Sequence, residues 1–246
     1  MKGADLVRQA AASATPFAAR SIAPSVDAAM LSRRSVRAFD PDPVSRETIE
    51  EILALASRAP SGSNIQPWQV IALTGAPLTA LTAVLHDQVM SHGVDSIARE
   101  YNYYPVKWRE PYIGRRRRVG WDLYSLLNIT RDDKARMTEQ HARNYLFFDA
   151  PAALIFTIDR DMEQGSWLDY GMFLQSVMLA ARGRGLDTCP EAAIAQSHEI
   201  VQRELKIPAD RQVVCGMALG FGRTATVNTL ITEREPVNGF TRFEGF

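Results

Sequence analysis

Two short strings in the chain combine residue types that could bind an anionic ligand. Residues 33–40 read Arg-Arg-Ser-Val-Arg-Ala-Phe-Asp, and residues 60–68 read Pro-Ser-Gly-Ser-Asn-Ile-Gln-Pro-Trp. The first string places three guanidiniums and a hydroxyl within five residues, which suits an anion held by bidentate and charge-assisted contacts. The second is a turn that leaves small polar donors beside exposed backbone amides. Taken alone, the first string could also be a solvated basic helix end, and the second could be an ordinary loop.

The arginine string brings two guanidiniums to one place in either regular backbone geometry. If residues 33–37 are extended, Arg33, Ser35 and Arg37 point to the same side, because side chains of a strand alternate with a period of two. If the residues are helical, Arg33 and Arg37 are still neighbours at positions i and i+4. Both geometries direct Arg34 elsewhere.

The order and spacing of the two strings resemble the paired signature of the nitroreductase family, the FMN-dependent NAD(P)H oxidoreductases. The resemblance implies that Arg33 and Ser35 hold the FMN phosphate and that Arg34 belongs to the same cofactor-binding string. It places Arg37 at the pyrimidine edge of the flavin, where a cation stabilises the negative charge of the reduced ring. It also implies that a turn of the partner subunit contacts the flavin; the matching residues are Pro60, Ser61, Gly62, Ser63 and Asn64.

A third segment, Gly-Leu-Asp-Thr-Cys-Pro-Glu-Ala-Ala at 185–193, resembles the family's strand along the reactive edge of the flavin. The resemblance implies that a backbone amide of Pro190, Glu191 or Ala192 lies at the flavin N5, although many relatives have Gly where this chain has Ala192. A lone Glu in a turn is more often a surface residue than a general base. Cys189 is expected to be a small packing residue rather than a nucleophile.

The sequence Glu233-Arg234-Glu235-Pro236 resembles the family's closing basic element, in which an arginine reaches the FMN phosphate. Arg234 inherits that role, while a solvated arginine paired with its neighbouring glutamates is the alternative. Where some relatives have a second basic residue this chain has Thr232, and Arg223 is a possible substitute. Asn144 matches a family asparagine near the flavin pyrimidine.

Residues 101–124 combine many aromatic side chains with Arg115-Arg116-Arg117-Arg118. The corresponding family region is a variable excursion over the open face of the cofactor, so the aromatics suit planar, electron-poor rings and the arginines suit the 2′-phosphate of NADPH. The alternative is a surface segment whose arginines are solvated or salt-bridged. A nucleic-acid module is disfavoured, because the aromatics fit no single-strand binding motif.

Composition excludes several classes of protein. The 28 basic and 28 acidic side chains cancel, so no global field favours nucleic acid or a membrane. Cys189 and Cys215 have no metal-type spacing and make no disulfide framework, so we expect no metal site. No apolar run approaches membrane-spanning length, and the Ala-rich N-terminus is a poor signal-peptide core. These features are typical of a cytoplasmic enzyme.

Apolar periodicity and capping residues predict an α+β fold with helices on both sides of a mixed central sheet. Ser45 is a predicted helix N-cap, and Ser166 with Asp169 is a predicted capping box. The predicted helices span 26–33, 46–59, 78–100, 131–148, 167–181 and 197–205, and the predicted strands span 67–74, 152–158, 186–190 and 212–219. The chain has no Gly-x-Gly-x-x-Gly motif after a strand and no Walker loop, which disfavours a Rossmann domain and a P-loop enzyme.

The segment 167–181 is apolar nearly all round, so the helix needs more cover than one small subunit offers. With the resemblance, this predicts a three-layer sandwich in an intertwined homodimer whose 223–246 tail wraps the partner. We divide the chain into an N-terminal extension, 1–25, and an FMN-binding domain, 26–246, with a variable lid at about 100–130.

The predicted function is reduction of nitroaromatic, quinone or similar electron-poor acceptors by NAD(P)H through FMN, in a ping-pong hydride-transfer mechanism. The alternatives are a specialised flavin enzyme of the same fold, either a reductive dehalogenase or a flavin-fragmenting synthase, and a non-catalytic flavin-binding protein.

Overall fold

A four-stranded antiparallel sheet forms the centre of the fold. The computed structural model describes residues 16–93 and 99–245. The strands lie in the order β1 (Gln69–Thr74), β2 (Ala152–Asp159), β4 (Arg211–Gly220) and β3 (Asp187–Glu191). All four strands were predicted to within about two residues, but the sheet that they form is antiparallel at every pairing rather than mixed. Parallel pairing in the described residues is confined to one bridge, between Ser35 and Thr188 at the outer edge of β3.

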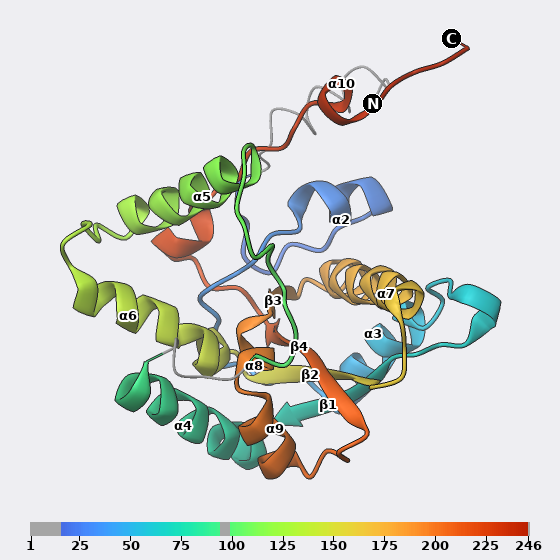
Figure 1. The fold of residues 1–246 in the computed structure, drawn as a ribbon, viewed down its shortest axis with the longest axis horizontal. Helices are drawn as coiled ribbons and strands as arrows, with labels where there is room; N and C mark the ends of the chain where they lie inside the picture. The colour runs from blue at the N-terminus through green and yellow to red at the C-terminus, as the bar shows by residue number, and fades with distance from the viewer. Residues whose placement is uncertain (1–15, 94–98, 246) are drawn as a thin grey trace.

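Helices cover both faces of this sheet, which confirms the predicted three-layer sandwich (Figure 1). Along β2, Ala153 and Ile155 belong to one core and Leu154 and Phe156 to the other, because successive strand residues point to opposite faces. One core lies under α3 (Arg46–Ala56) and α7 (Gln164–Arg182). The other lies under α4 (Gly75–His92), the 3₁₀ helix η3 (Arg143–Asp149), α8 (Ala193–Gln196) and α9 (His198–Leu205).

Local sequence accounts for most helix ends. Ser25 caps α2 (Val26–Ser32), and Ser45 caps α3 by accepting a hydrogen bond from the Thr48 N–H at 3.2 Å. The predicted helix over 78–100 ends at His92, and residues 94–98 of that range lie outside the described residues. The predicted helix over 131–148 is divided into α6 (Lys134–Ala142) and η3.

The predicted capping box at Ser166 and Asp169 is wrong. Helix α7 begins at Gln164, three residues before the predicted start, with Glu163 in the N-cap position, so Ser166 lies inside the helix. Its hydroxyl contacts the Met162 sulfur at 3.5 Å, and the Asp169 carboxylate accepts a hydrogen bond from the backbone N–H of Gly62 at 3.0 Å. The carboxylate therefore fixes the 60–64 turn rather than the start of its own helix.

The lid and the tail lie outside both cores. Helix α5 (Tyr112–Leu126) has no buried side chain, and neither has α10 (Val237–Phe240) near the end of the tail. The single 3₁₀ turn η4 (Thr226–Thr229) is the part of the tail that reaches the interior. Figure 1 shows the tail leaving the body of the molecule beside α5. Of the predicted N-terminal extension, residues 1–15 lie outside the described residues.

Neither a membrane-spanning helix nor a metal site is found in the described ranges 16–93 and 99–245. None of the helices there has the length and apolarity needed to cross a bilayer. No three His, Cys, Asp or Glu residues in those ranges lie together as metal ligands.

A buried ion pair at the end of α7 joins four segments of the chain. Arg182 donates from Nη1 to Oδ1 of Asp187 at 2.9 Å, and the two side chains are 4% and 2% exposed. The same guanidinium donates to the Ser21 hydroxyl at 2.9 Å and to the Ser32 hydroxyl at 3.2 Å. Because Arg33 directly follows Ser32, this network fixes the point from which the arginine string starts.

We expect Arg182→Met to lower the free energy of unfolding by about 3–5 kcal/mol, since it leaves the Asp187 carboxylate buried without a cation. Urea unfolding measures the loss. The matched control is Arg184→Met, which breaks the surface pair with Glu51 and should cost less than about 1 kcal/mol. The double variant Arg182→Met/Asp187→Asn should recover part of the loss, and equal losses for Arg182→Met and the control would contradict the assignment.

Candidate functional site

The arginine string is extended and runs along the outer edge of β3. The Val36 N–H donates to the Thr188 carbonyl at 3.0 Å, and the Val36 side chain is fully buried. Arg33, Ser35 and Arg37 all lie close enough to the buried Cys189 thiol to influence it. Burial raises the pKa of this thiol to about 12, with the Glu191 carboxyl adding to the rise, so Cys189 is a packing residue and not a nucleophile.

Arg33 lies half-buried without a carboxylate partner among the described residues. Burial lowers the pKa of its guanidinium, and the nearby guanidinium of Arg234 lowers it further. The Arg234 Nη1 is fixed by the Thr232 hydroxyl at 2.7 Å and by the Glu233 carbonyl at 2.9 Å. Two guanidiniums held near each other repel unless an anion lies between them, so this pair is a candidate phosphate site.

Arg34 points away from this pair. Its guanidinium donates to the backbone carbonyl of Asn228 at 3.4 Å and lies 5.7 Å from the ring centroid of Phe17. The Asp187 carboxylate also acts on it. The structure therefore places Arg34 in the buried network at the end of α7 and not with Arg33 and Arg37.

Asn228 is the functional candidate that sequence reasoning missed. It is 1% exposed, and its Oδ1 accepts from the Arg37 N–H at 2.7 Å. Its Nδ2 donates to the carbonyls of Ala38 and Arg223, both at 2.8 Å. This one amide joins the arginine string to the tail and fixes the backbone of Arg37. A single Asn in a short 3₁₀ turn gives no periodic signal from which it could be found.

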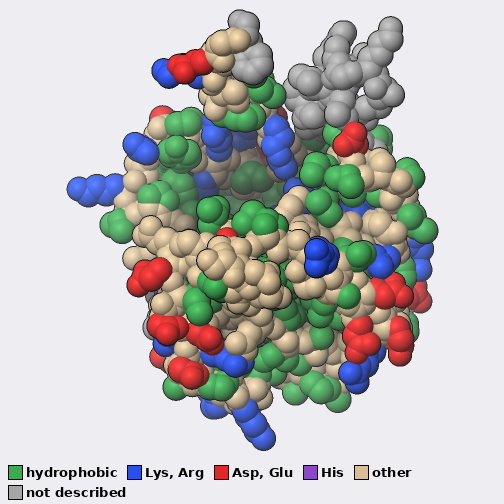
Figure 2. All heavy atoms as spheres, turned by 90° about the vertical axis from the view of Figure 1, so that its right-hand side faces the viewer, with side chains coloured by type: hydrophobic (Ala, Val, Ile, Leu, Met, Phe, Trp, Pro, Cys, Tyr) green, Lys and Arg blue, Asp and Glu red, His purple; other side chains and the backbone are tan. Residues whose placement is uncertain are grey.

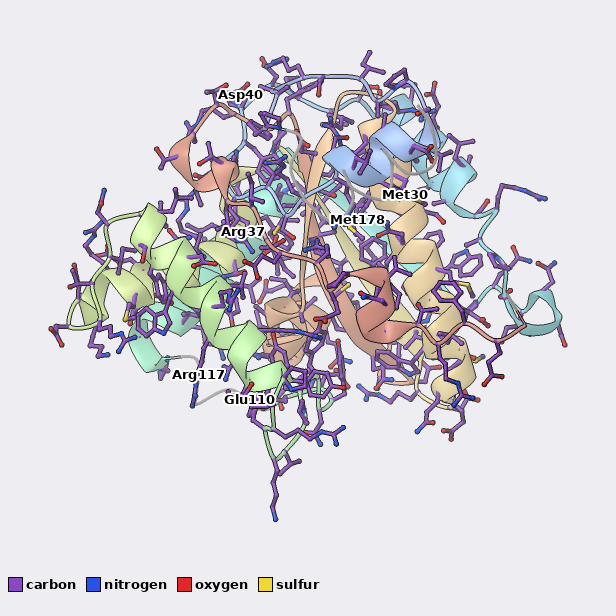
Figure 3. All side chains as sticks on the ribbon, turned by 90° about the horizontal axis from the view of Figure 1, so that it is seen from above. Met30, Arg37, Asp40, Glu110, Arg117 and Met178 are labelled. Carbon is purple, nitrogen blue, oxygen red and sulfur yellow. The ribbon has the colours of Figure 1, made fainter. Side chains whose placement is uncertain are left out.

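Arg223 also joins the arginine string to the tail, because its backbone N–H donates to the Ala38 carbonyl at 3.0 Å. Its side chain is exposed. Figure 3 shows Arg37 between α5 on one side and α2 and α7 on the other. Figure 2 shows a hollow beneath the tail with Lys and Arg side chains at its sides.

Glu191, expected at the surface, is 2% exposed at the end of β3. Neither of its carboxylate oxygens has a hydrogen-bond partner among the described residues. Burial raises the pKa of the carboxyl well above its usual range, and the positive charge of the nearby Arg37 guanidinium does not cancel the rise. The raised pKa favours the protonated form of Glu191 in the folded chain, and no ion pair between Arg37 and a carboxylate is found among the described residues.

An aromatic cleft of about 730 Å³ opens beside residues 190–192, at the end of β3. Pro190 is exposed and Ala192 half-buried, and both line the cleft. Tyr101 and Trp167 form part of its wall, with ring centroids 4.9 Å apart in an edge-to-face arrangement. Such walls suit a planar ring.

The 60–64 turn has the strained backbone expected of a binding loop. Ser63 and Asn64 have φ angles of 49° and 58°. Pro60, Gly62, Ser63 and Asn64 are exposed and Ser61 is half-buried. The turn packs against α7, and none of the hydrogen bonds or ion pairs found in the described chain joins it to the arginine string. One subunit alone does not bring the two strings together.

Asn144 is half-buried in η3, where its Nδ2 donates to the His141 carbonyl at 2.7 Å. This places it on the helical layer opposite α7, without a described hydrogen bond to the arginine string.

The four lid arginines have different environments. Arg115 pairs with Glu235 and Arg118 with Glu233, both at 2.5 Å. Arg116 lies over the rings of Trp108 and Tyr104, 4.9 and 5.5 Å from their centroids. Two of the four arginines predicted for the 2′-phosphate of NADPH are therefore occupied by the tail.

Comparison with known proteins agrees with this geometry. The model of the nitroreductase family matches residues 30–221. The chain is 43% identical to the 4-nitrobenzoate reductase of Pseudomonas putida, over 89% of this chain and 96% of that protein. It is 37% identical to the chloronitrobenzene nitroreductase of Comamonas testosteroni, over 89% and 97%. The crystal structure of the FMN and NADPH-dependent nitroreductase NfnB from Sphigopyxis sp. strain HMH superposes with a TM-score of 0.87 at 37% identity, covering 90% of this chain and 100% of that one.

We expect Glu191→Gln to stabilise the protein more at pH 8 than at pH 5. The raised pKa means that the folded chain holds a proton which the unfolded chain releases, so Glu191 destabilises the fold as the pH rises above about 4.3. Gln stays neutral, and each unit of the shift corresponds to about 1.4 kcal/mol. Urea unfolding at both pH values measures the difference.

The matched control for this prediction is Glu199→Gln on the exposed face of α9. A stability difference between Glu191→Gln and wild type that does not change from pH 5 to pH 8 would show that Glu191 is ionised in the folded protein.

Proposed function

Because the chain belongs to the nitroreductase family, we propose that it is an FMN-dependent oxidoreductase that reduces nitroaromatic compounds with NAD(P)H. The observation that carries the proposal is the pair of guanidiniums of Arg33 and Arg234, of which Arg33 has no carboxylate partner among the described residues. A phosphate monoester supplies the missing negative charge. The names of the relatives, which include FMN, NADPH and nitrobenzoate, are consistent with this choice.

The described residues fit FMN in charge and in donor type. Arg33 and Arg234 would hold the phosphate together with the Ser35 hydroxyl, and the exposed Arg223 lies nearby in the chain. FMN bound there would supply the redox chemistry, hydride acceptance from NAD(P)H and electron transfer to the acceptor. Arg37 would stabilise negative charge on the ring, because its guanidinium makes no ion pair with a carboxylate among the described residues and burial favours the protonated form of Glu191.

The proposed acceptors are nitrobenzene derivatives. The aromatic walls of the cleft beside Pro190 favour flat rings over aliphatic substrates. Quinones share this shape, and both substrates of a ping-pong reaction would use the same face. The backbone of Pro190–Ala192 and the partner's 60–64 turn would border the flavin.

We propose that the functional unit is a homodimer. In the single chain, α7 buries one face, while Leu168 on the other face is 70% exposed and Gly171 is also exposed. The 60–64 turn is held to α7 by the hydrogen bond from the Gly62 N–H to Asp169, and it makes no described hydrogen bond or ion pair with the arginine string. A second copy packed on the face that carries Leu168 and Gly171 would cover it and bring the 60–64 turn of one subunit to the arginine string of the other.

We propose a cytoplasmic location for the protein. The proposed reductant, NAD(P)H, is supplied in that compartment. Cys189 and Cys215 are both free and buried in the described structure, as expected where thiols stay reduced.

We expect Arg33→Ala to weaken FMN binding roughly tenfold or more, because a charge-assisted contact to phosphate contributes about 1.5–3 kcal/mol. Flavin fluorescence titration measures the dissociation constant, and riboflavin, which has no phosphate, should be unaffected. The control is Arg203→Ala on α9, whose guanidinium pairs with Glu204 at the surface.

Catalysis is tested on the same preparations. In the absence of dioxygen, wild type saturated with FMN should oxidise more than one equivalent of NAD(P)H per flavin only when 4-nitrobenzoate or another nitroaromatic is added, with parallel double-reciprocal plots. Unchanged FMN affinity in Arg33→Ala contradicts the phosphate site. A flavin-loaded protein that turns over no nitroaromatic acceptor contradicts the activity.

We expect Leu168→Glu to shift the protein from dimer to monomer and to release FMN, since it places a charge in the proposed interface. Leu168 is largely exposed in the single chain, so the substitution leaves the subunit fold intact. Sedimentation velocity recorded at the flavin absorption band reads both effects. Met90→Glu on α4, also exposed and in the opposite helical layer, is the control. A wild-type monomer with a full complement of FMN would contradict the dimer.

A further inference from the structure

We propose that α5 acts as a charge clasp for the tail: Arg115 and Arg118 neutralise Glu235 and Glu233 and so hold Arg234, between them, free to bind phosphate. The inference rests on the proposed role of Arg234 in FMN binding and extends it to two positioning residues in the lid. It gives the lid arginines a role in cofactor affinity rather than in recognition of the nicotinamide nucleotide.

The geometry of the clasp comes from two ion pairs in register. Arg115 Nη2 lies 2.5 Å from Glu235 Oε2, and Arg118 Nη1 lies 2.5 Å from Glu233 Oε2. Positions three apart on a helix lie on the same face, one turn from each other. The two glutamates are two apart in the tail, so one face of α5 engages alternate tail residues.

Arg234 is the residue between the two glutamates, and it is directed elsewhere. Its guanidinium acts on Arg33, and its Nη1 is held by the Thr232 hydroxyl and carbonyl and the Glu233 carbonyl. The described ion pairs of Glu233 and Glu235 are with α5 and not with Arg234. The tail thus presents acidic side chains to the lid and a basic one to the candidate phosphate site.

The charges explain why the clasp matters. A phosphate-binding arginine flanked on both sides by glutamates has two internal competitors for its guanidinium. Free glutamates would also repel a phosphate dianion within a few ångströms. Pairing both carboxylates with α5 removes the competition and the repulsion together.

Besides these ion pairs, α5 also packs near the 3₁₀ turn η4 of the tail. Helix α5 has no buried side chain, so its attachment to the rest of the chain depends on surface contacts. Its remaining basic residues do not contact the tail: Arg116 stacks on Trp108 and Tyr104, and Figure 3 shows Arg117 on the side of α5 away from the tail. Because linkage is reciprocal, bound FMN should also hold the lid against the tail.

The test measures FMN and riboflavin affinities of the full-length protein by fluorescence titration. Arg115→Ala/Arg118→Ala should weaken FMN binding about three- to tenfold, as expected for two exposed ion pairs, and leave riboflavin binding unchanged. The matched control is Arg117→Ala, which removes one positive charge from the same helix without touching the clasp and should change neither affinity.

A second set of variants identifies the cause. Adding Glu233→Gln and Glu235→Gln to the double variant should restore FMN affinity to within about twofold, because the competing carboxylates are then absent. In an Arg234→Ala background, Arg115→Ala/Arg118→Ala should have no further effect. An equal loss of FMN and riboflavin affinity, or no rescue by the two Gln substitutions, overturns the clasp.

The outcomes separate this inference from the proposed function. If Arg234→Ala leaves FMN affinity unchanged, the phosphate site itself is wrong. If Arg234→Ala weakens FMN binding but Arg115→Ala/Arg118→Ala does not, the site stands and the clasp is overturned. If the double variant instead raises the KM for NADPH and not for NADH with FMN affinity unchanged, the lid arginines read the nucleotide's 2′-phosphate.

Discussion

The buried pair of Arg182 and Asp187 is the contact on which the site's geometry depends. It ties the end of α7 to the start of β3, and through the hydroxyls of Ser21 and Ser32 it fixes the N-terminal segment and the end of α2. A guanidinium is suited to this because its five donors lie in one plane and reach several acceptors at once. The interior position makes the pair sensitive to loss of either partner, and the anion site begins one residue beyond Ser32.

From this anchor the site is assembled by backbone pairing and by one amide. The bridge between Ser35 and Thr188 sets the register of the arginine string on the outer edge of β3, and Asn228 holds that string to the tail. The tail then returns Arg234 toward Arg33. Two segments far apart in the chain, the arginine string and the tail, therefore present their cations to one place, and the proposed partner turn would add polar donors.

The sequence predicted elements well where one local rule dominates. Ser45 and the apolar face that follows it define α3, and the alternation of Arg33, Ser35 and Arg37 around buried Val36 correctly indicates which side chains converge. Prediction from the sequence failed where contacts between distant segments determine the environment of a residue. The Ser166–Asp169 pattern is a plausible cap, but the Asp169 carboxylate is engaged by Gly62. Glu191 is buried because β3 pairs with β4 over its length, and no local pattern of charge reveals that pairing.

The absence of buried side chains in α5 has an evolutionary consequence. Substitutions on a helix that contributes nothing to either core change stability little, so its aromatic and basic residues are open to exchange as substrates change. Arg115 and Arg118 are exceptions, because their ion pairs with Glu235 and Glu233 of the tail constrain them. Within such a scaffold, new acceptor preferences arise by drift across the lid's outer face while the cofactor-holding framework underneath stays intact, which makes this helix the natural place to begin directed evolution.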